Sequence, residues 1–120
     1  MRTVLSVAMF GVVLFGGHAW AHPAEAEEPT LADCTRALEE GWGRTKQLPS
    51  RSLSRYFAER FMQSAETEAG NGEYDDCVEY SEKAVDEVEN RWHRLAPGES
   101  FRVTTSTGYL ELRGDDQEDR

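Results

Sequence analysis

The apolar positions of the chain fall into three stretches with helical spacing, followed by one stretch in which they alternate with polar residues. In the third and clearest stretch, apolar or small residues recur every three or four positions from Tyr74 to Leu95. Acidic residues fill the positions between them. A spacing of three and four places such residues on one face of a helix. The pattern predicts an amphipathic helix that Pro97 and Gly98 stop.

Two further helices are predicted upstream of this one. The first begins after Thr30, an N-cap residue that has Asp33 three positions on as a capping-box partner, and its apolar face extends to Trp42. The second runs from about residue 53 to residue 69 and ends at Gly-Asn-Gly, residues 70–72, which accept positive φ. The three helices predict a bundle.

The alternating stretch is FRVTTSTGYLEL, residues 101–112, in which threonine is frequent and Ser-Thr-Gly offers a turn. It predicts either a short β-hairpin or an extended arm. A two-stranded hairpin is marginal on its own in water, so this segment has to lean on the helices or on a partner. We therefore expect an all-α fold, a three-helix bundle with a C-terminal β-hairpin or extended arm.

The N-terminus has the pattern of a secretory signal peptide. Arg2 precedes an uncharged apolar run over residues 4–15, and small residues follow up to Ala21. The apolar run is shorter than the ~20 residues that a membrane-spanning helix needs. We expect cleavage after Ala21, with Ala19 and Ala26 as alternatives, and no membrane insertion of the mature chain.

These patterns divide the chain into four segments. Residues 1–21 are the signal peptide, 22–29 a flexible N-terminus, 30–113 the helical domain with its C-terminal arm, and 114–120 a disordered acidic tail. The signal peptide predicts a periplasmic or secreted protein. An arginine-rich basic composition favours, by association, a Gram-negative bacterial source.

The two cysteines, Cys34 and Cys77, lie on the apolar faces of the first and third predicted helices. Facing positions on packed helices can meet the Cβ separation of a disulfide, and an exported protein reaches an oxidising compartment. A structural disulfide is therefore favoured over two buried free thiols. It is also favoured over a redox or metal role, because the chain has no CxxC or CxxCH motif.

The formal net charge of −10 excludes non-specific nucleic-acid binding. Basic residues gather in residues 44–60, whereas residues 66–89 are strongly acidic. Two interpretations remain open. The basic segment and the acidic helix pack side by side and the remaining charge is solvated, or the acidic helix offers a surface to a basic partner.

Residues 58–90 resemble a single tetratricopeptide repeat. An aromatic residue, Phe61, precedes a small residue, Ala65, and GEYDDCVEYSEKAV then matches the turn and second helix of the family. The signature positions matched in this run are Gly72, Tyr74 and Ala84.

The match departs from the family at Ser64 and Glu68, where the family prefers leucine and tyrosine, and only one repeat is visible. The resemblance implies a helical hairpin that acts as a binding module. It also implies a partner-binding surface on the first helix of the repeat, formed by Glu59, Met62 and Glu66.

Candidate chemistry is sparse elsewhere in the chain. Ser50, Ser52 and Ser54 lie by a helix start and are interpreted as caps, and Asp75 with Asp76 as solvated charge without a calcium-loop motif. A copper site built on a mature N-terminal His22 and on His93 has no supporting ligand cluster. We expect no catalytic residue, no metal site and no cofactor.

The sequence thus favours a non-catalytic protein that engages a protein partner, as an interaction or accessory protein. The alternative is a small-ligand or metal-binding carrier, and an enzyme is a remote third. The identity of the partner and the oligomeric state stay open.

Overall fold

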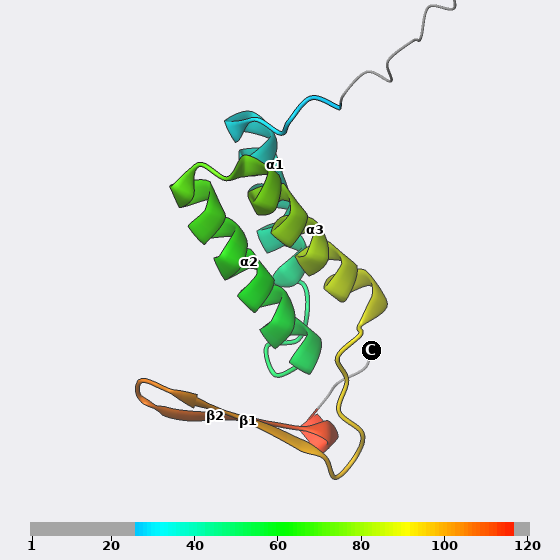
Figure 1. Cartoon of the computed structure of the whole chain (residues 1–120). Helices are drawn as coiled ribbons and strands as arrows, with labels where there is room; N and C mark the ends of the chain where they lie inside the picture. Colours follow the sequence, from blue (N-terminus) through cyan, green and yellow to red (C-terminus); the bar gives the residue numbers. More distant parts are fainter. Residues whose placement is uncertain (1–25, 117–120) are drawn as a thin grey trace, which may run out of the picture.

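The computed structural model describes residues 26–116, which form three helices, a hairpin and a short 3-10 helix (Figure 1). The predicted signal peptide, its cleavage positions Ala19 and Ala21, and residues 117–120 lie outside the described residues. The elements are α1 (Leu31–Thr45), α2 (Leu53–Asn71), α3 (Tyr74–Asn90), β1 (Ser100–Thr105), β2 (Gly108–Arg113) and η1 (Gly114–Asp116).

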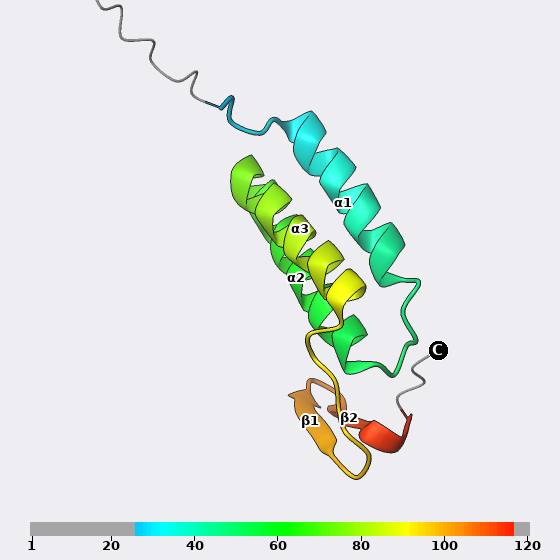
Figure 2. The same ribbon diagram turned by 90° about the vertical axis from the view of Figure 1, so that its right-hand side faces the viewer.

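The three helices pack as a bundle in which α2 is antiparallel to both α1 and α3 (Figures 1 and 2). α1 begins as predicted, because the Thr30 side chain accepts from the Asp33 N–H and the Asp33 carboxylate accepts from the Thr30 N–H. α2 ends at Gly72, whose φ of 83° is the left-handed conformation that favours glycine. The predicted helical bundle is confirmed.

The centre of the bundle is built from small residues and one methionine. Ala58, Met62 and Ala84 are fully buried, and larger apolar side chains from all three helices surround them. α1 approaches closely at Gly41, where a Cβ would lie 2.8 Å from Met62 Cε. A side chain at Gly41 would therefore require the flexible end of the Met62 side chain to shift within the core.

The disulfide between Cys34 and Cys77 is confirmed. It joins α1 to α3 across a Cα separation of 5.7 Å and a sequence separation of 43 residues. Both cysteines are fully buried. The cross-link therefore lies within the packed interface, near the N-terminal ends of the two parallel helices.

α3 ends earlier than its apolar pattern indicates. The predicted helix continues to Leu95, but α3 stops at Asn90 and Arg91 adopts a left-handed conformation with φ of 50°. The turn brings His93 back to Glu87, whose two carboxylate oxygens lie 3.0 Å from His93 N and 2.8 Å from His93 Nδ1. Since Glu87 is buried, the early helix end supplies its carboxylate with hydrogen-bond partners.

The predicted all-α class is wrong, because residues 100–113 form a two-stranded antiparallel sheet. Thr105 pairs with Gly108 across a two-residue loop. The sheet packs against α2 through Phe101. The centroid of the Phe101 ring lies 5.3 Å from that of Tyr56 and 5.9 Å from that of Phe57. The protein is therefore mostly helical with a β-hairpin.

The acidic segment predicted to be a disordered tail starts with an ordered turn, Gly114–Asp116. Asp116 pairs with Arg51 at 3.0 Å, and Asp115 accepts from the Gly98 N–H at 3.1 Å. The Gly114 N–H donates to the Glu99 carbonyl at 2.8 Å and so closes the base of the hairpin. These contacts fix a segment whose composition alone predicts disorder.

Candidate functional site

The partner surface implied by the tetratricopeptide resemblance is only partly accessible. Met62 is fully buried, so it does not belong to an exposed face. Glu59 accepts a hydrogen bond from Arg55 Nε at 2.8 Å within α2, and Glu66 accepts one from Trp42 Nε1 at 2.7 Å. A partner on Glu59 and Glu66 stays a prediction.

A groove runs between α1 and α3, on helices that lie side by side in parallel (Figure 2). Its volume is about 330 Å³. Its floor is apolar, because Ala37 of α1 and Val78 and Val85 of α3 are only half-buried there. The remaining lining residues are Asp33, Arg36, Glu40, Ser81, Glu82, Asp86 and Glu89.

The rim of this groove is strongly acidic, with five carboxylates against one arginine among its lining residues. Arg36 pairs with Asp33, and Arg44, at the start of the basic segment, pairs with Glu89 at 3.2 Å and with Glu40 at 3.6 Å. Within residues 26–116, no cation pairs with Glu82. The groove thus keeps an excess of negative charge beside an apolar floor.

Asp33 contributes a permanent charge to the rim. Its carboxylate accepts from the Thr30 backbone N–H at 2.9 Å and from the Thr30 hydroxyl at 2.7 Å, and it pairs with Arg36. Because these contacts stabilise the ionised form, the backbone hydrogen bond foremost, the pKa of Asp33 is lowered to about 2. Asp33 is therefore negative at any physiological pH.

An exposed aromatic ring lies at the edge of the groove. Trp92 is 67% exposed, and its Nε1 donates to the Asp86 carboxylate at 2.7 Å. Asp86 also accepts from Asn90 Nδ2 at 2.6 Å, which holds the carboxylate in place. Large exposed aromatic side chains are enriched among the residues that dominate protein interfaces, so Trp92 extends the candidate surface beyond the groove.

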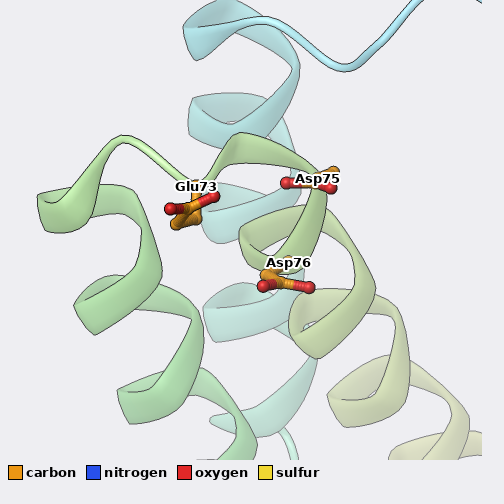
Figure 3. A group of neighbouring side chains, drawn as sticks. All are labelled: Glu73, Asp75 and Asp76. Carbon is orange, nitrogen blue, oxygen red and sulfur yellow. The ribbon is translucent and has the colours of Figure 1, made fainter.

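The acidic cluster at the start of α3 is a separate feature (Figure 3). Carboxylate oxygens of Glu73, Asp75 and Asp76 lie within 4.8 Å of one another, and all three side chains are exposed. Negative charge in the first turn of a helix is favourable because of the helix dipole. The cluster is explained by that role.

Two of the serines considered as candidate chemistry, Ser52 and Ser54, and the histidine His93 have structural partners. Ser52 caps α2 by accepting from the Arg55 N–H at 3.1 Å, and the Ser54 hydroxyl donates to the His93 carbonyl at 2.9 Å. The His93 ring stacks on Phe57 with centroids 3.8 Å apart. His93 thus anchors the chain after α3, whereas His22 lies outside the described residues.

The groove was not predicted from the sequence. Val78 and Val85 belong to the apolar stripe of the third predicted helix, which assigned them to the core. They stay half-exposed because α1 packs against α3 at its small residues, Cys77 and Ser81, and leaves the flank of the stripe uncovered. The sequence signal that could have predicted the groove is the width of this apolar stripe, which is greater than one packed helix covers.

Across residues 26–116, none of the helices has the length and apolar character to cross a membrane. No protein-family model matches the chain, and no curated protein and no solved structure shows significant similarity to it. The tetratricopeptide resemblance and the binding role that it implies therefore stay expectations drawn from the residues.

Proposed function

We propose that this protein is a non-catalytic interaction or accessory protein that is exported to the periplasm or secreted, where it binds another protein. The observation that supports this proposal is the acid-rimmed groove between α1 and α3. It combines an apolar floor, a one-sided charge and a neighbouring exposed ring, Trp92. Interfaces between proteins share this combination of an apolar centre and a polar rim.

A small-ligand carrier is the weaker alternative. Ligand pockets have volumes of about 300–1,000 Å³ and bury most of the ligand surface. The groove, at about 330 Å³, is at the lower end of that range and is a surface feature between two helices. An open groove of this kind fits one face of a polypeptide better than it fits a small molecule, which a ligand pocket would enclose.

The Cys34–Cys77 disulfide is compatible with an oxidising extracellular or periplasmic compartment. Export is testable by unfolding the protein from cells that produce the full chain in denaturant with an alkylating reagent and without reductant, and then measuring its mass. The denaturant is needed because both cysteines are buried in the folded protein. Neither cysteine should be modified after export. Full modification of both would contradict an oxidising location.

The binding function is testable with a photo-crosslinking amino acid placed at Val85 in the groove or at Tyr109 on the hairpin. Tyr109 is exposed and lies outside the groove, so it serves as the matched position. We expect a protein adduct in the natural host, and saturable binding when the captured protein is purified and titrated by calorimetry. Capture of no protein from either position, together with a small molecule that co-purifies, would favour the carrier.

A further inference from the structure

The dimensions of the groove suit one helix. On α3 its lining runs from Val78 to Glu89, a length of about 17 Å at the 1.5 Å rise of a helix. Val78 and Val85 are seven residues apart, so they lie on the same side of α3 about two turns from one another. The uncovered seam between the parallel helices α1 and α3 offers a further helix, from another chain, a place to pack.

The chemistry of the groove defines what such a helix has to carry. The floor formed by Ala37, Val78 and Val85 has small or medium side chains, which leave space for larger apolar side chains of a partner. The carboxylates on both walls would repel an acidic partner and attract lysine or arginine. They include Glu82, which has no cationic partner within residues 26–116.

We infer that the groove between α1 and α3 binds a cationic amphipathic helix of a protein partner, with its apolar side on the Ala37–Val78–Val85 floor and its basic residues beside the acidic rim. This inference rests on the proposed interaction function and names its site and the class of its partner. Trp92 would cover one end of the bound helix, since its ring is tied to Asp86 on the rim.

A second copy of the chain is a less suitable occupant. The formal net charge is −10, so two copies repel one another at low ionic strength. Within the described residues, the three helices already pack their central apolar residues against one another in the bundle. Charge complementarity therefore points to a different, basic chain.

The test uses the disulfide-bonded protein, purified after production of the full chain, and a synthetic peptide of about 14 residues. As a helix the peptide is ~21 Å long, with leucines every third or fourth position and lysines elsewhere. We expect saturable binding, a gain of helical circular dichroism, and NMR shifts confined to the groove and the Trp92 indole N–H. A short peptide is barely helical alone, so the gain of helix reports the bound conformation.

Two peptides and two protein variants provide the controls. Changing every lysine of the peptide to glutamate should abolish binding, and changing every leucine to serine should weaken it by about tenfold or more. Glu82→Lys should weaken binding by about fivefold to tenfold. Glu39→Lys makes the same charge change on an exposed residue of α1 outside the groove, and should change the affinity by less than about twofold.

Four outcomes would overturn the inference. Equal binding of the leucine-free peptide would mean attraction to the general negative charge, and equal effects of Glu82→Lys and Glu39→Lys would mean the same. Groove shifts that appear on concentrating the protein alone would identify a second copy as the occupant. Crosslinking of a partner from Tyr109 but not from Val85 would overturn the groove site and leave the proposed interaction function intact.

Discussion

The two ends of the helical bundle are held by different kinds of contact. At one end, the disulfide joins Cys34 and Cys77 near the first turns of α1 and α3. At the other end, a cluster that we term the His93 latch holds the chain that leaves α3. The latch consists of His93 with its contacts to Ser54, Phe57 and Glu87.

The difference between the ends has consequences for the groove. A disulfide acts largely by restricting the unfolded chain, whereas the latch acts only through contacts in the folded state. The disulfide thus fixes the end of the groove beside Asp33 covalently. The opposite end of the groove lies near Trp92, one residue before His93 of the latch. Redox conditions should act on the first end, and local substitutions on the second.

Removing the disulfide should have the largest effect on stability. For a loop that spans a sequence separation of 43 residues, the chain-entropy model gives about 4 kcal/mol as an upper figure. The double variant Cys34→Ala, Cys77→Ala should therefore melt about 15–30 °C below the oxidised protein in a calorimeter. Wild-type protein in reductant is the control and should melt near the variant. An unchanged melting temperature would mean that the disulfide does not stabilise its end of the bundle.

Breaking the His93 latch should have the next largest effect. Glu87→Ala leaves the His93 backbone N–H and ring nitrogen without their buried acceptor, at a cost of about 3 kcal/mol. Hydrogen exchange should show loss of protection first at the hairpin and later near the disulfide. Glu87→Gln keeps the size of the side chain and one carbonyl acceptor, so it should lose less stability. Equal loss of protection at both ends would contradict a local latch.

Crowding the base of the hairpin should affect the latch end alone. A Cβ at Gly114 would overlap the Ala96 carbonyl and lie 3.1 Å from Pro97 N, which are backbone atoms with little room to move. Gly114→Ala should cost about 2 kcal/mol. Gly43→Ala is the matched control, because a Cβ there meets nothing within 4 Å, and in α1 it should stabilise by up to about 1 kcal/mol. Destabilisation by both would point to a general intolerance of alanine.

Features with a local signal were predictable from the sequence. The capping box of Thr30 and Asp33 and the glycine end of α2 at Gly72 depend on neighbouring residues, and both are present. The cysteine pair was predictable because both thiols fall on apolar faces of strongly patterned helices. These features form as predicted because few tertiary contacts favour a different local structure at these residues.

The errors concern features that contacts beyond a single helix or strand pattern decide. The apolar spacing continues through Trp92 and Leu95, but the helix stops at Asn90 because the buried Glu87 takes partners from the following chain. The all-α class gave too little weight to the alternation over residues 101–112, which forms a sheet that packs on α2 through Phe101. The groove was not predicted because it depends on how much of the apolar face of α3 is covered by α1. The residue pattern of one helix does not show how much of its face another helix covers.

The smallest expected effect on stability comes from substitution of Asp33, at the disulfide end of the bundle. This substitution distinguishes the contribution of the Asp33 charge from that of the disulfide. The pKa of Asp33 is lowered to about 2, so the folded state favours the ionised carboxylate. The stabilisation is therefore present above the pKa of about 4 of an unfolded aspartate and is lost as the pH falls through about 2. Asp33→Asn should lower the melting temperature slightly at pH 7, and the difference from wild type should shrink toward pH 2. In the oxidised protein Cys34 already holds the first turn of α1, so the same substitution should matter more in the Cys34→Ala, Cys77→Ala background. A difference that persists unchanged at pH 2 would assign the effect to the shape of the cap instead of its charge.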